Sequence, residues 1–504
     1  MAKILVANRG EIALRIMKTA RAMGLKTVAV YSDADAHSLH VLSADEAIYL
    51  GSSEPSASYL NGKAIIDAAK SVGADLVHPG YGFLSERSEF AEQCKAAGIK
   101  FVGPPASAMN QLGDKIQAKK LAQECGLPVA PGYFEPGATV ADLKSASDEI
   151  GYPVMLKASA GGGGRGMRVV RDAAEFDSLA ALASEEAVKA FGDGALMVEK
   201  YLEQPRHVEV QFLTTPIGET LLFFERECSM QRRHQKLIEE APFSEMTEEH
   251  WQSLASGVRA LSERAGYRNA GTVEFMFDPT SNEFYFLEVN ARLQVEHPVT
   301  EAICGVDLVQ FQILTAMGEN LEGVERFAEA DRSAIRGHAI EARIVAEDPA
   351  KGFLPAVGTV REFFAPIGPG VRVDTGIQRG SEVSQYYDSL LAKLVVHASD
   401  RDAAIEKMGT NLENFHVLGI PTNIGFQKRL VDSEAFRTNQ YHTKYLDENM
   451  DQFTEPQAVP NELAALINSK TGSRISNAGG NGAARQREVA WATGDHFRNV
   501  QSSR

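Results

Sequence analysis

The stretch Val154-Met-Leu-Lys-Ala-Ser-Ala-Gly-Gly-Gly-Gly-Arg-Gly-Met167 joins an apolar strand, which ends in Lys157, to a run of five glycines within residues 161–166. Glycine has no Cβ, so the backbone amides of such a run are free to turn toward a polyphosphate. No Lys follows the glycines, and the run therefore differs from the P-loop pattern. A flexible linker is the alternative, but a linker needs neither a Lys before it nor a strand after it.

The residues around this loop predict a small unit with its own strands and helix. A helical pattern covers Asp172 to Ala190, and a second strand covers Ala195 to Glu199. We expect residues 130–203 to form a lid within a longer middle region. The tetrad Glu199-Lys200-Tyr201-Leu202 at the end of the second strand is a candidate for presenting backbone groups to a purine ring.

Toward the N-terminus, short apolar strands alternate with helical patterns, which predicts a parallel, doubly wound sheet. A dinucleotide site of the Rossmann type needs GxGxxG after the first strand, and Asn8-Arg9-Gly10-Glu11 stands there instead. We therefore interpret this layer as scaffold. The predicted strands are Lys3–Ala7, Lys26–Tyr31, Asp75–His78 and Ile99–Gly103, and the first helix is Glu11–Met23.

These patterns predict an α/β and α+β protein with three domains and a tail. The N-terminal doubly wound domain covers residues 1–113, and the middle domain with its lid covers 114–333. A C-terminal mixed α/β domain covers 334–447 and begins with the strand His338–Ile344. Residues 448–504 form a tail, which we expect to be flexible from about 461 because Asn, Gly and Ser are frequent there.

The composition of the chain argues against a nucleic-acid-binding, membrane or secreted protein. The chain has 504 residues and a net charge of −16, which argues against a nucleic-acid partner because phosphate binding needs a cationic face. No apolar run reaches the ~18–20 residues of a membrane helix, and the N-terminal apolar run is too short for a secretion signal. The 4 cysteines form no CxxC pair, so neither a disulfide framework nor a structural zinc site is predicted. We expect a cytoplasmic protein without a membrane partner.

Two strand-like runs, Gly271–Phe277 and Phe284–Asn290, are joined by a polar turn and predict a hairpin. Counting back from the turn places Glu274 almost opposite Glu288. Two buried carboxylates repel each other unless a cation joins them, and oxygen ligands suit Mg²⁺ on nucleotide phosphates. Asn290 lies on the same face as Glu288. A register slip of one residue would instead separate the two acids.

Basic and polar residues form two further clusters. Gln231-Arg-Arg-His-Gln-Lys236 has apolar and acidic flanks, which favours burial in a site over a solvated face. Strict strand alternation puts His234 and Lys236 on one face and Gln231 on the other, so the segment must bend if all three serve one site. In Asn290-Ala-Arg-Leu-Gln-Val-Glu-His-Pro298, period-two spacing predicts one face for Arg292, Gln294 and Glu296. Such an arginine suits a small planar anion beside a carboxylate base, and a structural ion pair is the alternative.

Together these residues resemble biotin carboxylase over about residues 1–447. The resemblance rests on several motifs that are highly specific in combination: Asn8-Arg-Gly-Glu-Ile12, His78-Pro-Gly-Tyr-Gly-Phe-Leu-Ser-Glu86, the glycine loop, Arg226–Lys236, Glu288–Pro298 and His338-Ala-Ile-Glu-Ala-Arg343. It implies an ATP-grasp fold with an N-terminal pre-ATP-grasp layer, a mobile lid and a homodimer.

The resemblance also implies roles for residues at matching positions. ATP would be held by Lys115, Lys157, Gly161, Gly162, Gly163, Gly164, Gly166, Met167, Glu199, Lys200, Tyr201, Leu202, His207, Gln231, His234 and Met276. A pair of Mg²⁺ or Mn²⁺ ions would be held by Glu274, Glu288 and Asn290. Bicarbonate would be surrounded by Lys236, Arg292, Gln294, Val295 and Glu296, and the biotin ureido ring would contact Tyr81 and Arg343. The catalytic set would be Arg292, Glu296, Lys236 and Arg343.

The implied reaction is ATP-dependent carboxylation of biotin by bicarbonate through carboxyphosphate. No Met-Lys-Met sequence occurs, so we expect biotin on a separate carrier protein or domain and a carboxyltransferase on another chain. An acetyl-CoA or other acyl-CoA carboxylase of fatty acid biosynthesis is the first expectation, and a component of a pyruvate carboxylase is the second. The alternatives are an ATP-grasp ligase that joins a carboxylate to an amine, and a regulatory protein that binds ATP without turnover.

Overall fold

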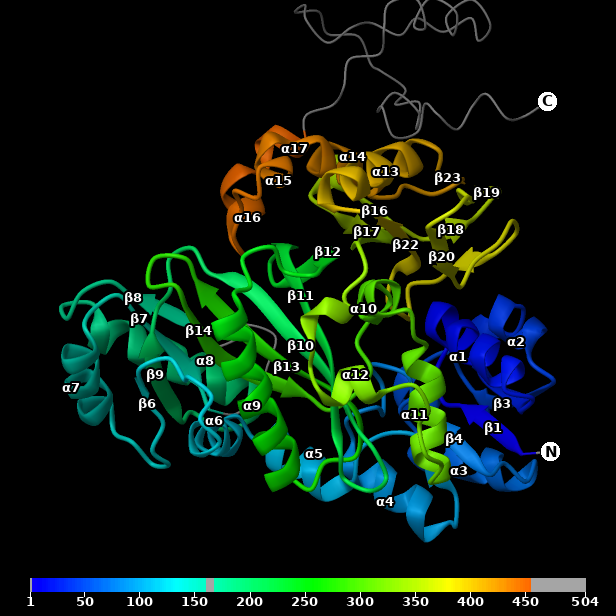
Figure 1. Cartoon of the computed structure of the whole chain (residues 1–504), viewed down its shortest axis with the longest axis horizontal. Helices are drawn as coiled ribbons and strands as arrows, with labels where there is room; N and C mark the ends of the chain where they lie inside the picture. Colours follow the sequence, from blue (N-terminus) through cyan, green and yellow to red (C-terminus); the bar gives the residue numbers. More distant parts are fainter. Residues whose placement is uncertain (1, 160–166, 455–504) are drawn as a thin grey trace, which may run out of the picture.

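The computed structural model describes residues 2–159 and 167–454, and Figure 1 shows their arrangement. The glycines of the predicted phosphate loop and the predicted tail beyond residue 454 lie outside the described residues. In Figure 1 the N-terminal sheet lies at the right and the lid at the left, on opposite sides of the long central sheet.

The N-terminal sheet is parallel and five-stranded, in the order β3-β2-β1-β4-β5, which confirms the predicted doubly wound layer. Its first strand is apolar because helices cover both faces, and its residues from Ile4 onward are buried. The strands are β1 (Lys3–Val6), β2 (Lys26–Ser32), β3 (Glu46–Gly51), β4 (Leu76–His78) and β5 (Lys100–Phe101). The helices are α1 (Gly10–Ala22), α2 (Leu39–Ser43), α3 (Gly62–Ser71), α4 (Ser88–Ala96) and α5 (Ala106–Gly113).

One antiparallel sheet runs through the middle and C-terminal regions, in the order β14-β13-β10-β11-β12-β15-β22-β20. Its strands β10 and β11 are buried along their whole length, so both faces of this part of the sheet are covered. The strands are β10 (Arg206–Thr214), β11 (Thr220–Arg232), β12 (Gln235–Ala241), β13 (Asn269–Asp278), β14 (Glu283–Asn290), β15 (His338–Val345), β20 (Val371–Thr375) and β22 (Leu390–Ala398).

The predicted lid residues carry a separate four-stranded sheet, in the order β6-β9-β7-β8. Its apolar core is distinct from the cores of the larger sheets. The helix expected from Asp172 begins later, because the Asp172 carboxylate accepts hydrogen bonds from the amides of Ala174 and Glu175 in a turn before it. The elements are β6 (Gly132–Tyr133), α7 (Val140–Ile150), β7 (Val154–Ala158), β8 (Arg168–Val170), α8 (Phe176–Phe191) and β9 (Leu196–Lys200).

The remaining helices pack on the central sheet or close its C-terminal end. They are α6 (Lys115–Glu124), α9 (Glu248–Arg264), α10 (His297–Cys304), α11 (Leu308–Met317), α12 (Glu325–Ala328), α13 (Arg401–Glu413), α14 (Ile424–Asp432), α15 (Glu434–Arg437), α16 (Tyr445–Asn449) and α17 (Asp451–Thr454). Short strand pairs also occur, formed by β16 (Glu347–Asp348), β17 (Leu354–Pro355), β18 (Gly358–Thr359), β19 (Glu362–Phe364), β21 (Glu382–Val383) and β23 (His416–Leu418). Within the described ranges no single helix has the length and apolarity to cross a membrane; α10 and α11 reach them only as a pair bent by 94°.

Candidate active site

The ammonium group of Lys236 lies at the centre of three buried carboxylates. Its Nζ is 2.7 Å from Glu209 Oε2, 3.0 Å from Glu274 Oε1 and 2.6 Å from Glu296 Oε1. Burial lowers the pKa of this lysine, but the three acids outweigh burial and raise its pKa well above the usual value. The cluster joins β10, β12, β13 and the residue before α10, so four segments meet at one charged centre.

Gln231 and Lys236 share a face because a two-residue turn separates β11 from β12. The two residues are directly paired across the hairpin. The turn residues Arg233 and His234 have φ values of 47° and 64°, the conformation that tight hairpins require. The predicted bend is therefore this hairpin turn. It leaves His234 exposed at the tip, away from the Lys236 cluster.

The Glu296 carboxylate is held between two cations. Arg343 Nη2 lies 2.9 Å from Glu296 Oε2, and Arg343 Nε lies 2.5 Å from Glu239 Oε1. Burial raises the pKa of Glu296, yet Lys236 and Arg343 outweigh burial and hold that pKa well below its ordinary range. The two cations therefore favour the ionised form of this carboxyl group.

The prediction that Arg292, Gln294 and Glu296 share one strand face is wrong. Strand β14 ends at Asn290, and the residues after it are irregular until Glu296 becomes the N-cap of α10. Arg292 nevertheless donates to Gln294 Oε1 (2.7 Å) and Asn290 Oδ1 (3.0 Å), and pairs with Glu86 (2.9 Å) instead of Glu296. Its guanidinium edge is thus fixed by neutral and acidic partners beside the Lys236 cluster.

Glu274 and Glu288 pair directly across β13 and β14, as the sequence predicted. Glu274 Oε1 accepts from Asn290 (2.8 Å) and Gln294 (3.1 Å), and His207 Nε2 is 3.0 Å from Glu274 Oε2. The Glu288 side chain makes no hydrogen bond or ion pair within residues 2–159 and 167–454. Burial and the carboxylate of Glu274 raise the pKa of Glu288.

A divalent cation fits this arrangement chemically. It would relieve the repulsion between the buried carboxylate of Glu274 and the half-buried carboxylate of Glu288, and its preferred ligands are oxygen atoms of the kind that Glu274, Glu288 and Asn290 supply. The Asn290 carbonyl oxygen now accepts from Arg292, so this amide would exchange partners when it binds a metal. Acids and a histidine also converge as His207–Glu209–Glu274, but Lys236 already neutralises that group.

The predicted nucleotide side is organised by Glu199, whose carboxylate contacts both Lys157 and Lys119. Two backbone amides of the predicted tetrad already bond within the lid: the Lys200 amide donates to Pro131 O (2.7 Å) and the Tyr201 amide to Pro153 O (3.2 Å).

Lys115 begins α6, and it lines a cavity of about 570 Å³ together with Glu288 and Asn290. Met276 pairs with His207 across β10 and β13.

Tyr81 lies on the loop after β4, where Asn8 holds it. The Asn8 side chain donates to Pro79 O (2.7 Å) and Tyr81 O (2.8 Å). The Tyr81 hydroxyl donates to Glu11 Oε2 at 2.5 Å. Asn8 and Glu11, both in the motif Asn8–Ile12, therefore hold Tyr81, which belongs to the motif His78–Glu86.

Sequence reasoning missed several residues of the cluster. Glu209 lies two residues after His207 on β10, and Lys119 lies one helical turn after Lys115. This spacing puts each residue on the same face as a predicted site residue, so the sequence could have indicated both. Arg226, which contacts Glu209, and Glu239, which contacts Arg343, had no such signal because their partners come from other strands. Burial raises the pKa of Glu239 to about 7 although Arg343 opposes that shift.

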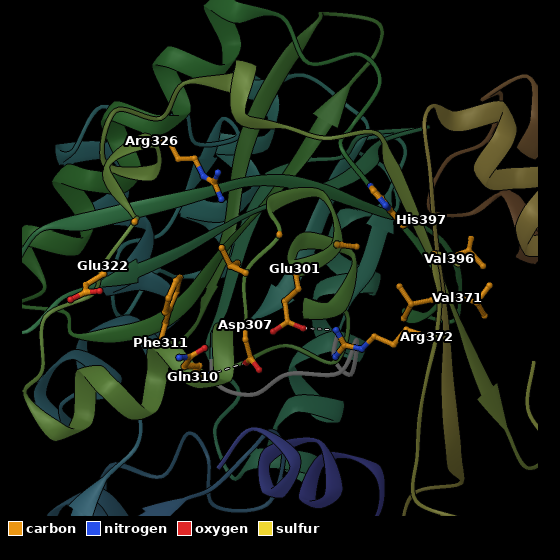
Figure 2. A pocket seen from close by; sticks show the side chains of 16 residues that line it. Glu301, Asp307, Gln310, Phe311, Glu322, Arg326, Val371, Arg372, Val396 and His397 are labelled. Atoms are coloured by element: carbon orange, nitrogen blue, oxygen red, sulfur yellow. Dashed lines mark hydrogen bonds and ion pairs between the residues drawn. The ribbon is translucent and has the colours of Figure 1, made fainter. Parts of the chain in front are cut away.

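A second cavity, of about 650 Å³, contains none of the predicted site residues (Figure 2). Arg372 lies 2.7 Å from Glu301, and Arg15 contacts both Glu301 and Asp307. Glu301 and Asp307 of this cavity are therefore already paired with arginines, and we place the chemistry at the Lys236 cluster, where the predicted residues converge.

Three known domain families match the chain in sequence. The biotin carboxylase N-terminal domain matches residues 1–109, the ATP-binding domain of the carbamoyl-phosphate synthase L chain matches 114–324, and the biotin carboxylase C-terminal domain matches 341–448.

Whole proteins match over most of this chain. The alpha subunit of mitochondrial methylcrotonoyl-CoA carboxylase from Glycine max is 48% identical over 445 residues, which are 88% of this chain and 60% of that protein. A pyruvate carboxylase subunit from Methanothermobacter thermautotrophicus is 47% identical, over 88% of this chain and 89% of that protein. The chain thus spans about 60% of the first relative and most of the second.

A crystal structure of the 2-oxoglutarate carboxylase biotin carboxylase domain dimer from Hydrogenobacter thermophilus superposes with a TM-score of 0.84. It is 43% identical and covers 90% of this chain and 99% of that one. That dimer is in complex with MgADP, ADP and bicarbonate.

Proposed function

Because the chain belongs to the biotin carboxylase family, we propose that it uses ATP and bicarbonate to carboxylate biotin carried by another protein or domain. One observation carries this proposal: the Glu296 carboxylate is buried and paired with both Lys236 and Arg343. A bound bicarbonate there would meet a proton acceptor and cations in one place.

The first step needs a stronger nucleophile than bicarbonate. Glu296 would take the bicarbonate proton while Lys236 and the Arg292 edge hold the anion. A carbonate oxygen then bonds to the γ-phosphorus of ATP, and the bond from that phosphorus to the β,γ-bridging oxygen breaks. The products are ADP and carboxyphosphate. A divalent cation bound by Glu274, Glu288 and Asn290 would neutralise charge on the phosphates.

The second step transfers carbon to biotin. Carboxyphosphate splits into CO₂ and phosphate, and the phosphate takes the proton from N1′ of biotin. Arg343 would stabilise the negative charge on the ureido oxygen while N1′ bonds to CO₂. Tyr81, fixed by Glu11 and Asn8, would contact the same ring. Water must be excluded during these steps, because it would hydrolyse the intermediate.

The acceptor of the carboxyl group and the partner proteins belong to this proposal as well. The relatives above are subunits of methylcrotonoyl-CoA and pyruvate carboxylases, and they give no support to the expectation of acetyl-CoA and fatty acid biosynthesis. We therefore favour an acyl-CoA or 2-oxo acid carboxylase with a biotin carrier and a carboxyltransferase as partners. The dimeric structural relative supports a homodimer.

ADP release by the purified chain tests the proposal. With Mg-ATP, ADP should form only when bicarbonate is present, and free biotin should increase the rate. Glu296→Ala should abolish it. A rate of ADP release that depends on neither bicarbonate nor biotin would refute the proposal and favour a ligase that joins a carboxylate to an amine.

A further inference from the structure

Lys393 is a buried lysine that lies beside the proposed site without belonging to the predicted set. It comes from β22, and its side chain has an exposed fraction of 0%. Its Nζ donates to the carbonyl oxygen of Val295 at 2.9 Å and lies 3.0 Å from Glu11 Oε1. A buried ammonium group is costly unless it is paired and hydrogen-bonded, so these two contacts fix its position.

Val295 and Glu11, the two residues that Lys393 contacts, lie on the sides of the site proposed for bicarbonate and for biotin. Val295 lies between Gln294 and Glu296, in the segment that would surround bicarbonate. Glu11 accepts the hydroxyl hydrogen bond of Tyr81 through its other oxygen, at 2.5 Å, and Tyr81 would contact biotin. One ammonium group therefore connects the bicarbonate segment to the biotin side through a single carboxylate.

The position of Lys393 in the sheet adds a third relationship. On β15 and β22, Arg343 and Lys393 are directly paired, so their side chains share a face of the sheet. Lys393 Nζ is also 6.0 Å from the centre of the Tyr81 ring. The lysine thus stands among the three groups whose relative placement decides whether CO₂ meets biotin.

We propose that Lys393 is a positioning residue, which holds the Arg292–Glu296 segment at a fixed place relative to Tyr81 and Arg343. This inference rests on the proposed function. Released CO₂ is captured efficiently only when the ureido nitrogen is held close to it, and small displacements of reacting groups reduce rates strongly. Loss of Lys393 should therefore uncouple the two steps, so that ATP is consumed while less biotin is carboxylated.

The test compares the two products of one reaction. Wild type and Lys393→Met are supplied with Mg-ATP, labelled bicarbonate and free biotin, and both ADP and carboxybiotin are measured. We expect the ADP formed per carboxybiotin to rise on the order of tenfold in Lys393→Met, because CO₂ that is released beside a displaced biotin ring escapes before N1′ captures it. A second variant, Glu11→Gln, removes the charge that pairs with Lys393 and keeps an oxygen that can accept from Tyr81, so it should raise the same ratio if Lys393→Met does not fold.

Arg401→Met is the matched control. Arg401 also joins the C-terminal region to β12, through Glu240 at 2.8 Å, and Glu240 follows Glu239, so it points to the opposite face of the sheet. This control should lower the thermal midpoint and leave the ratio of products unchanged. Lys393→Met with an unchanged ratio, or with a ratio matched by Arg401→Met, would overturn the inference and leave the proposed function standing. A wild type without bicarbonate-dependent ADP release would overturn both.

Discussion

Glu274 and Glu288 face each other across β13 and β14 immediately before a β-bulge that shifts the register by one residue. Beyond the bulge Phe275 pairs with Phe286, so the register of the hairpin changes between the Glu274–Glu288 pair and the Phe275–Phe286 pair. The bulge brings the two carboxylates together at the end of the sheet nearest the site. Lys236, Asn290 and Gln294 contact Glu274 directly, which leaves the Glu288 carboxylate as the less neutralised member of the pair.

Glu288→Gln should weaken the binding of the activating metal. The substitution keeps the shape of the side chain and removes one of the two charges, so we expect the Mg²⁺ concentration for half-maximal ADP release to rise by about tenfold or more. Glu283→Gln, on the same strand but exposed, is the control and should leave the Mg²⁺ dependence unchanged. An unaltered Mg²⁺ titration of Glu288→Gln would contradict the metal assignment.

Arg292→Lys should impair bicarbonate use although it keeps the positive charge. Arginine makes separate contacts to Glu86, Asn290 and Gln294, and one ammonium group cannot reproduce that planar fork. We expect the KM for bicarbonate to rise by about tenfold, as measured by ADP release at varied bicarbonate. Arg264→Lys, at a surface ion pair with Glu124, should behave like wild type. An equal response of both variants would rule out a specific role for the fork.

The parts of the site that the sequence predicted depend on local spacing. The pairing of Glu274 with Glu288 follows from counting around one turn, and the buried strand Lys3–Val6 follows from its composition. The hairpin between Gln231 and Lys236 was harder to predict, because its turn residues Arg233 and His234 adopt positive φ without the Gly or Asn that marks such turns.

The rest of the site depends on segments that are far apart in the chain. Lys393 meets Glu11 because β22 of the C-terminal region packs beside α1, and no spacing within either segment indicates that contact. The segment after Asn290 has the polar alternation of a strand, but within the described part of the chain it pairs with no strand and instead leads irregularly into the N-terminus of α10. Local patterns therefore predict the elements and single hairpins, and tertiary packing decides which charges meet.

Lys119→Met should weaken nucleotide use. Glu199 contacts both Lys119 and Lys157, and removing one partner lets the carboxylate hold Lys157 more tightly, away from a phosphate. We expect the KM for ATP to rise by about tenfold while kcat changes less, because the effect is on binding. Lys120→Met is the matched control, since Lys120 is adjacent but exposed and paired with Glu135. If the KM for ATP is the same in both variants, Lys119 has no part in the nucleotide site.

His40 should make the fold sensitive to acid. The side chain is fully buried, and burial lowers its pKa to about 4, although Asp35 partly opposes that shift. Its pKa in the unfolded chain is about 6.5, so between pH 6.5 and 4 the unfolded state binds a proton that the folded state does not. Stability is therefore complete above pH 6.5 and falls as the pH drops, by about 1.4 kcal/mol per unit from this group. The thermal midpoints of wild type and His40→Gln, measured from pH 7 to pH 5, should show a smaller acid loss in the variant. Parallel curves would mean that other groups cause the acid sensitivity.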